Sequence, residues 1–170
     1  MEKKWISMIE ESECKKQIDY ARLAAFIDGE GWVSILRRKN HSERKTGNKN
    51  LTYSFVIGVA NTSIPLHTWL EEIFGGKTYS RKNRENIVIK GEKTKQNKKA
   101  YQWHITSHDA IKLLKQIRPY LIIKGAQADL AFEFYNKYMK HPHKGMNGTP
   151  LWLLKYAEEY YNKMKELNSL

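Results

Sequence analysis

The chain has 170 residues, of which 41% are hydrophobic, and a formal net charge of +12 at pH 7. This length fits one domain or one tightly packed pair of subdomains, and the apolar content is sufficient for a core. No segment approaches the roughly 18 apolar residues of a membrane span, and no signal peptide opens the chain, so we expect a soluble, intracellular protein.

The strong positive charge predicts a polyanionic partner. Nucleic acid is the first expectation, and an anionic membrane surface is the second. The single cysteine, Cys14, excludes an intramolecular disulfide and a zinc site built from cysteines. His104 and His108 are four residues apart, but the residues between them predict a strand that gives way to a helix, which disfavours a metal-binding pair.

The first predicted element is a short helical extension over residues 1–18, followed by a helix that opens near Asp19 and ends at residues 29–31. At helical spacing, this second helix has two different faces. The bulky side chains that suit a core are Leu23, Phe26 and Ile27. The small side chains that suit close contact with another backbone are Ala21, Ala24, Ala25 and Asp28.

From Trp32 to Lys39 the apolar period changes to two, which predicts a strand with basic residues at its end. After a polar turn over residues 41–50, a second strand alternates cleanly. Its aromatic and branched side chains are expected to face the core, and they are Tyr53, Phe55, Ile57 and Val59. The small and polar side chains on its other face are left free to meet a ligand.

Ser63 and Pro65 predict the start of the next helix, which Gly75 and Gly76 end. Strands are expected over residues 77–82 and 101–106. The most basic segment of the chain, residues 81–99, lies between them and is expected to contain a short internal strand over residues 87–89.

Ser107 is expected to cap a further helix that stops at Pro119. Lys124 begins an almost uniformly apolar helix through Met139, which we expect to be largely buried. Thr149 and Pro150 then start a last helix. Its buried face is predicted to carry Leu154, Ala157, Tyr161 and Met164.

The order of these elements predicts the αββαββα plan of an α+β protein. In this plan, an antiparallel sheet carries its helices on one face. The other face is then expected to be polar and basic, and such a face can lie in the major groove of DNA.

Asp28 and Glu30 alternate with Gly29 and Gly31 at the point where the first long helix is expected to stop. The last carbonyls of a helix lack partners, and the helix dipole favours cations there. Carboxylate and carbonyl oxygens are the ligands of a hard divalent ion such as Mg²⁺ or Ca²⁺, not of zinc. The alternative is an ordinary glycine cap with two solvated acids.

Residues 23–31, LAAFIDGEG, resemble the LAGLIDADG motif of homing endonucleases, and the departures, which include Ala25, Phe26 and Glu30, are ones that the family pattern accepts. Residues 118–128 resemble a second signature of the family, Pro-Tyr-Leu-x-x-Lys-x-x-Gln-Ala. The resemblance covers about residues 19–139, which form the expected core domain. Residues 1–18 fall outside it as an N-terminal extension, and residues 140–170 as a C-terminal loop and helix packed on the same domain.

The resemblance implies a saddle-shaped antiparallel sheet and an endonuclease that makes metal-dependent double-strand breaks in a long, pseudo-palindromic DNA target. Because the chain contains one motif, it also implies an intron-encoded homodimer, which we expect to pair through the small face defined above. Glu30 and the Gly29 carbonyl are expected to bind Mg²⁺, with Ca²⁺ or Mn²⁺ as substitutes. Lys124 is expected to assist the attacking water or the transition-state charge, and Asn61 to organise that water.

DNA contacts implied by the resemblance come from the open sheet face and its loops. The expected residues are Ser34, Arg38, Asn40, Thr52, Ser54, Arg81, Lys82, Gln102 and His104. Lysines among residues 90–99 are expected to meet phosphates. Two alternatives stay open: an RNA maturase on the same fold, and a DNA-binding protein that does not cleave.

Overall fold

The structure is a computed structural model that describes residues 2–39, 51–80, 88–89, 92–93, 99–141 and 149–169, with the backbone alone for residues 2–10, 39, 88–89 and 92–93. The helices are α1 (Glu2–Glu30), α2 (Ile64–Phe74), α3 (Ser107–Ile117), α4 (Gly125–Phe134) and α5 (Leu151–Leu167). A 3₁₀ turn spans Arg118–Tyr120, and a π-helical turn spans Tyr135–Met139. The strands are β1 (Gly31–Lys39), β2 (Leu51–Asn61), β3 (Lys77–Ser80), β4 (Val88–Ile89), β5 (Glu92–Lys93) and β6 (Tyr101–Thr106).

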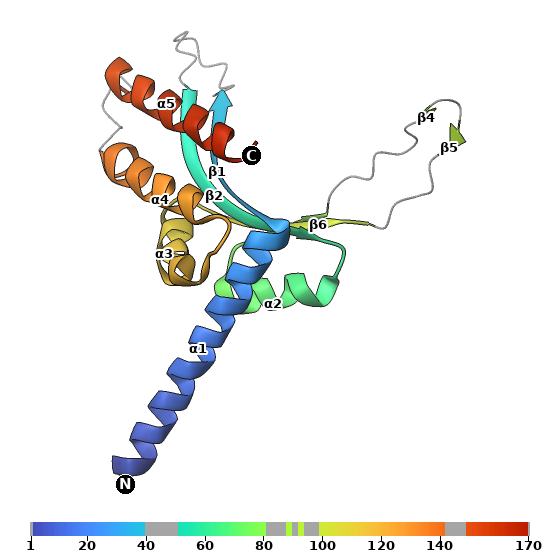
Figure 1. Cartoon of the computed structure of the whole chain (residues 1–170), viewed down its shortest axis with the longest axis vertical. Coiled ribbons are helices and arrows are strands. Elements are labelled where there is room, and N and C mark those ends of the chain that lie inside the picture. Colours follow the sequence, from blue (N-terminus) through green and yellow to red (C-terminus); the bar gives the residue numbers. More distant parts are fainter. Residues whose placement is uncertain are drawn as a thin grey trace, which may run out of the picture.

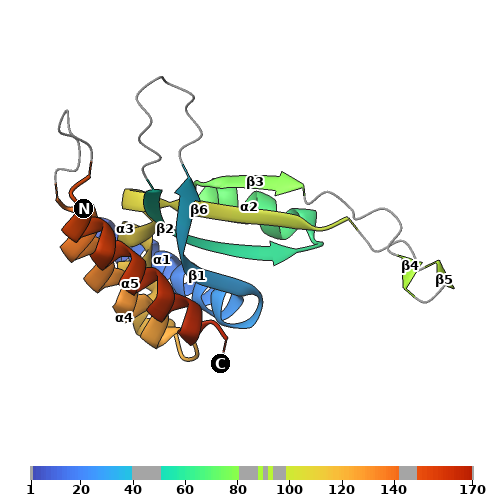
Figure 2. The ribbon, with the colours of Figure 1, turned by 90° about the horizontal axis from the view of Figure 1, so that it is seen from above.

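Four strands form an antiparallel sheet in the spatial order β1-β2-β6-β3, and β4 pairs with β5 in a separate hairpin. The sheet is strongly curved, and the helices pack on its convex side (Figures 1 and 2). Within the described residues, the concave side carries no helix. The predicted αββαββα order and the α+β architecture are therefore confirmed.

The core lies between the convex face of the sheet and the helices. As predicted, Tyr53, Phe55, Ile57 and Val59 of β2 are buried on this side. From the neighbouring strands, Val33, Ile35, Trp103 and Ile105 join them. Period-two alternation thus assigned the two faces of the sheet correctly.

Helix α1 is one continuous helix from Glu2 to Glu30, so the helix start expected near Asp19 is wrong. The Asp19 side chain is buried and lies 3.5 Å from Arg22 one turn later, an intrahelical pair that needs no break in the backbone. In Figure 1 the N-terminal half of α1 projects away from the rest of the molecule.

The predicted start of α2 is confirmed, whereas the starts of α3 and α4 each differ from the prediction by one residue. Ser63 caps α2 as predicted, because its hydroxyl accepts the Leu66 N–H. By contrast, Thr106 is the N-cap residue of α3, and Ser107 is its first residue with φ of 58°. Lys124 is the N-cap of α4, which begins at Gly125 and passes into the π-helical turn before Met139.

Helix α5 packs along α4 and β1. Its buried side chains are Leu153, Ala157, Tyr160 and Met164, so the predicted stripe through Leu154 and Tyr161 was displaced by one residue at two positions.

The Glu158 carboxylate of α5 accepts a hydrogen bond from the Tyr53 hydroxyl and another, of 2.6 Å, from Arg37. Burial and this neighbouring carboxylate raise the pKa of Tyr53.

In the part of the chain that the structure describes, no helix has the length and apolar content needed to cross a bilayer.

Candidate functional site

The acidic end of α1 lies at the junction between this helix and the sheet. Gly29 and Glu30 are exposed there, and α1 passes directly into β1 at Gly31. A Cβ at position 31 would lie 2.6 Å from the carbonyl oxygen of Gly58. Glycine is therefore required at position 31, where the backbone of β1 approaches that of β2 closely. The Glu30 carboxylate is thereby held beside the end of β2.

Asn61, the last residue of β2, fixes the orientation of that carboxylate. Its side-chain Nδ2 donates to Glu30, while its Oδ1 accepts the Ser63 N–H at 2.8 Å. Because Oδ1 faces an N–H group, the amide must present its NH₂ group to Glu30. Asn61, the residue expected to organise the attacking water, is thus hydrogen-bonded to Glu30.

The Lys124 side chain, which comes from the turn before α4, contacts the C-terminal end of α1. Its ammonium donates to the Asp28 carbonyl oxygen at 2.7 Å, one of the helix-terminal carbonyls that lack an intrahelical partner. The Asp28 carboxylate accepts the backbone N–H groups of Ile122 (2.7 Å), Ile123 (3.2 Å) and Lys124 (2.9 Å). Asp28 therefore fixes the turn that brings Lys124 to the same helix end as Glu30.

Arg118 supports this turn from its other end. Its guanidinium binds the Asp129 carboxylate with two hydrogen bonds, at 2.8 and 2.7 Å, and a Cβ at Gly125 would lie 3.2 Å from Arg118. The hydrogen bonds to Arg118 hold the pKa of Asp129 below its ordinary value. The turn over residues 118–125 is therefore tied at both ends.

This ion pair gives a pH-dependent prediction. Because the folded pKa of Asp129 is below its ordinary value of 3.8, the pair stabilises the fold above that pH, and the contribution disappears as the pH falls through the folded pKa. Asp129→Asn should lower the free energy of unfolding at pH 7 by at most about 1 kcal/mol, since the pair is partly exposed. Urea denaturation measures this difference, which should disappear as the pH falls through the folded pKa of Asp129.

Asp109→Asn is the matched control, because Asp109 forms a longer, 3.7 Å pair with Lys112 and both side chains are well exposed. This variant should change the unfolding free energy less than Asp129→Asn does. An equal loss in both variants at every pH would contradict a stabilising role for the Arg118–Asp129 pair.

The donors at the α1 end fit a hard divalent cation in chemical type. Glu30 supplies an exposed carboxylate, and the adjacent backbone supplies carbonyl oxygens. Asp28 is directed instead toward the turn before α4. Among the described residues, no three His, Cys, Asp and Glu side chains are grouped in a way that could hold a metal.

The concave face of the sheet is defined by the strand register, which places Trp32 opposite Gly58, Gly58 opposite His104, and His104 opposite Lys77. Side chains directly opposite one another share a face. The described concave positions are Trp32, Ser34, Leu36, Arg38, Thr52, Ser54, Val56, Gly58, Ala60, Lys77, Tyr79, Gln102, His104 and Thr106. None of these positions is acidic, and Arg38 and Lys77 are basic.

Six of the predicted DNA contacts lie on this concave face: Ser34, Arg38, Thr52, Ser54, Gln102 and His104. Asn40, Arg81 and Lys82 lie outside the described residues. Sequence reasoning missed Trp32, Leu36, Lys77 and Tyr79. The alternation of Lys77 and Tyr79 along β3 was a usable signal, but only pairing with β6 fixes which face they occupy.

Two aromatic contacts make this face less polar than predicted. Tyr79 stacks on His104 with ring centroids 5.0 Å apart. Trp32 covers Gly58, where a Cβ would lie 2.3 Å from its ring. Partial burial and the nearby Arg38 lower the pKa of His104. His108, in contrast, contacts the Tyr135 hydroxyl on the helical side, which separates it from His104.

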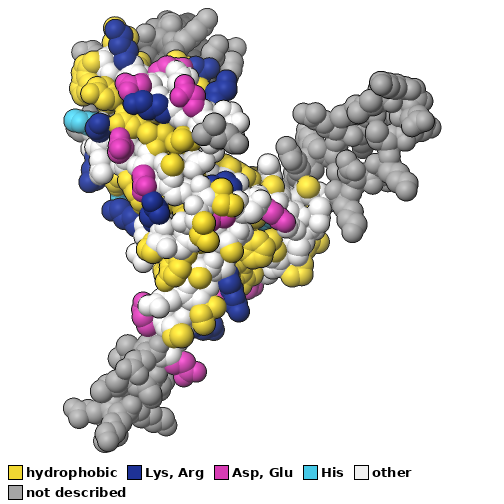
Figure 3. Space-filling model, viewed as in Figure 1, with side chains coloured by type: hydrophobic (Ala, Val, Ile, Leu, Met, Phe, Trp, Pro, Cys, Tyr) yellow, Lys and Arg dark blue, Asp and Glu magenta, His cyan; other side chains and the backbone are white. Residues whose placement is uncertain are grey.

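The small face of α1 is only partly available for pairing. Ala25 is exposed and Ala21 is half-buried, but Ala24 is fully buried in the core of its own protomer, so the prediction that Ala24 contributes to the dimer interface is wrong. Exposed isoleucines border this face: Ile18 is 46% exposed, Ile122 90% and Ile123 69%. Hydrophobic side chains are also visible along the described part of α1 in Figure 3.

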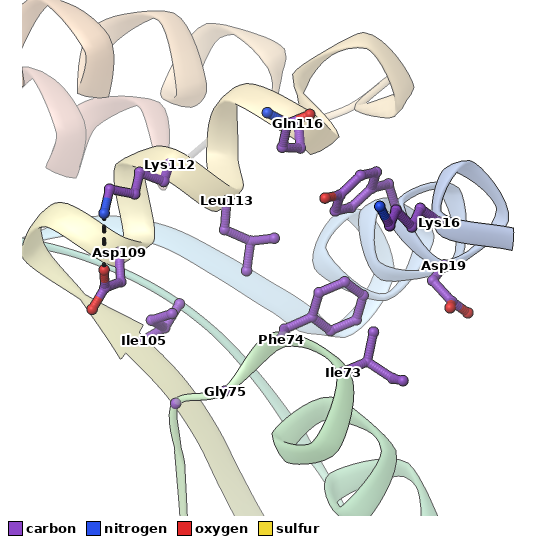
Figure 4. A pocket seen from close by; sticks show the side chains of 12 residues that line it. Lys16, Asp19, Ile73, Phe74, Gly75, Ile105, Asp109, Lys112, Leu113 and Gln116 are labelled. Atoms are coloured by element: carbon purple, nitrogen blue, oxygen red, sulfur yellow. Dashed lines mark ion pairs between the residues drawn. The ribbon is translucent and has the colours of Figure 1, made fainter. Parts of the chain in front are cut away.

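A cavity of about 510 Å³ lies between helices α1, α2 and α3. Tyr20 of α1, Phe74 at the end of α2 and Leu113 of α3 line its apolar part, with Lys16 and Asp109 among the polar side chains around them (Figure 4). Glu30, Asn61 and Lys124 do not line it. The candidate functional residues Glu30, Asn61 and Lys124 lie instead around the C-terminal end of α1.

Comparison with known proteins gives a match to one family. The sequence model of the LAGLIDADG endonuclease family matches residues 23–123, more than half of the chain. Among curated proteins, none matches the chain.

Solved structures share the fold at low sequence identity. The homing endonuclease I-CvuI, in complex with the I-CreI target and 2 mM Mg with the DNA not cleaved, has a TM-score of 0.67 at 18% identity over 90% of this chain and 83% of that one. The archaeal intron-encoded homing endonuclease I-Vdi141I, complexed with DNA, has a TM-score of 0.60 at 14% identity over 88% and 84%. I-GzeII, in complex with its DNA target, has a TM-score of 0.58 at 15% identity over 84% of this chain but 43% of that one.

Proposed function

The chain belongs to the LAGLIDADG endonuclease family, and we propose that it is a site-specific homing endonuclease that makes double-strand breaks in a long, pseudo-palindromic DNA target. The observation that carries this proposal is the grouping of Glu30, Asn61 and Lys124 at the end of α1. Asn61 donates a hydrogen bond to the Glu30 carboxylate, and the Lys124 ammonium donates one to the Asp28 carbonyl oxygen two residues earlier. The concave face that begins beside them has no acidic residue at its described positions.

The concave face is suited to the DNA duplex. Arg38 and Gln102 have the donor geometry that reads guanine and adenine edges in the major groove, and Ser34, Thr52 and Ser54 can donate to base edges or phosphates. Lys77 adds positive charge on the same face. Because phosphate contacts release counterions, affinity for DNA should fall steeply as salt increases.

Glu30 and the Gly29 carbonyl are the groups that would hold Mg²⁺, for which Ca²⁺ or Mn²⁺ could substitute. When bound, the cation supplies charge stabilisation for hydrolysis of a phosphodiester. Asn61 holds the Glu30 carboxylate at the end of β2 through its side-chain amide. The Lys124 ammonium lies at the same helix end, on the Asp28 carbonyl oxygen, and can offset negative charge that develops on the phosphate.

A homodimer is the second part of the proposal. Among the described residues, one protomer groups fewer than three His, Cys, Asp or Glu side chains at this helix end, and a two-fold axis through the α1 ends would bring a second Glu30 close to the first. Ala21 and Ala25 permit a close approach of helices, and the exposed Ile18, Ile122 and Ile123 offer apolar area around them. The length of I-GzeII, of which this chain covers 43%, is consistent with two such units.

Ala25→Arg should convert the dimer to a monomer, because a long charged side chain at this position keeps the two helices apart. We expect the mass measured by sedimentation equilibrium to fall by half and cleavage of both strands to be lost. Ser12→Arg adds the same charge at another exposed site on α1 and should stay dimeric. A wild-type chain that sediments as a monomer on DNA would contradict the dimer.

A selection experiment can identify the DNA target and test the proposed function together. Duplexes selected from a random DNA library in EDTA should yield a pseudo-palindromic site, and a supercoiled plasmid carrying that site should be linearised on addition of Mg²⁺. Binding without cleavage in Mg²⁺ and in Mn²⁺ would instead indicate a DNA-binding protein on the same fold.

A further inference from the structure

His67 of α2 is a buried histidine with an unusual hydrogen-bonding state. Its side chain is 3% exposed, and its Nε2 lies 3.1 Å from the backbone carbonyl oxygen of Asn61. A carbonyl oxygen only accepts hydrogen bonds, so the neutral imidazole must carry its hydrogen on Nε2. The other ring nitrogen, Nδ1, is buried with no hydrogen-bond partner among the described residues.

This arrangement argues against a role in packing alone. A buried acceptor without a partner destabilises the fold, and an apolar side chain of similar size would fill the same space without that cost. The contact that distinguishes the histidine from such a side chain is its hydrogen bond to Asn61. Its ring also packs 5.7 Å from Tyr101, the residue paired with Asn61 across the sheet.

Asn61 is consequently held at three points. Its carbonyl oxygen is bound by His67, its Oδ1 by the Ser63 N–H at 2.8 Å, and its Nδ2 by Glu30. Ser63 and His67 belong to the cap and first turns of α2, so this helix fixes the last residue of β2 from the side opposite Glu30. Loss of the contact at the carbonyl would let the end of the strand, and the amide with it, rotate away from the carboxylate.

We propose that His67 is a positioning residue that holds Asn61, and through it Glu30, in the arrangement needed for cleavage. This inference rests on the proposed nuclease function. The buried His67 side chain bonds to the Asn61 carbonyl oxygen, so it acts through the backbone of Asn61.

Two substitutions separate this role from packing. His67→Gln can place an amide N–H near the position of Nε2, whereas His67→Met fills the pocket without a donor. On a plasmid carrying the selected site, His67→Met should lower kcat at least about tenfold with the Kd for DNA in EDTA within about threefold, and His67→Gln should restore kcat to within about threefold of the wild type. Leu70→Val, which alters a fully buried residue of the same helix, is the control for lost packing and should leave kcat nearly unchanged.

A second readout does not require activity. Solvent exchange of the Asn61 side-chain amide protons, followed by NMR in the intact chain, should be at least about tenfold faster in His67→Met than in the wild type or in His67→Gln. Unchanged exchange in His67→Met would overturn the role of His67, as would equal losses of kcat in the Met and Gln variants. A wild-type chain that cleaves no DNA would overturn the proposed function instead, and the exchange measurement would then decide the role of His67.

Discussion

Glu30→Gln is expected to lower DNA cleavage by about 10³-fold, equivalent to about 4 kcal/mol in the barrier, while leaving affinity for the target within about threefold. The substitution keeps the size of the side chain, and its amide oxygen can still accept the hydrogen bond from Asn61. It removes the negative charge that would hold a divalent cation. Linearisation of the target plasmid in Mg²⁺ and gel-shift titration in EDTA measure the two effects.

Glu11→Gln is the control for this experiment, because Glu11 is an exposed glutamate of the same helix far from the acidic end. It should cleave like the wild type. Undiminished cleavage by Glu30→Gln would remove Glu30 from the mechanism, and equal loss of binding and cleavage would indicate a structural role.

Asp28→Ala is expected to lower the free energy of unfolding by about 2–3 kcal/mol, because three backbone N–H groups lose the carboxylate that accepts their hydrogen bonds. The turn from Ile122 to Lys124 would then be free to move, so cleavage should fall by about 10²-fold even under conditions where the variant is fully folded. Urea denaturation measures the first effect, and single-turnover cleavage measures the second.

Asp28→Asn should give an intermediate result. The amide oxygen can still accept the two N–H groups that share Oδ2, but the NH₂ group faces the Lys124 N–H and cannot accept it. If Asp28→Ala unfolds at the same urea concentration as the wild type, the turn does not depend on this carboxylate.

The sheet and its two faces could be predicted because they follow from local alternation. Tyr53, Phe55, Ile57 and Val59 bury their side chains together, and their strand neighbours turn the other way, as the period of two requires. Glu30 and Lys124 could be singled out from motifs in the sequence. Their proximity depends on the turn before α4, which no local pattern encodes.

Contacts between distant elements account for what was missed. The pairing of β3 with β6 decides which side of the sheet Tyr79 faces, and the packing of α1 against the core decides that Ala24 is buried whereas Ala25 is exposed. His67 offered no signal in the sequence, since a single histidine on an amphipathic helix is most simply a core or surface residue. Its importance depends on the position of the Asn61 carbonyl, which only the folded chain defines.

Spontaneous disulfide formation by Ala25→Cys, in a chain that also carries Cys14→Ser to remove the one native cysteine, tests most directly whether two α1 helices meet near their acidic ends. Two cysteines can be bridged only when their Cα atoms lie within about 7 Å of each other. If the helices pair as proposed, the Ala25→Cys chain will become a covalent dimer under mild oxidation, and DNA carrying the target will not prevent it. The matched Ser12→Cys chain will stay unlinked. Failure of Ala25→Cys to crosslink, or crosslinking no faster than Ser12→Cys, would contradict the paired active site.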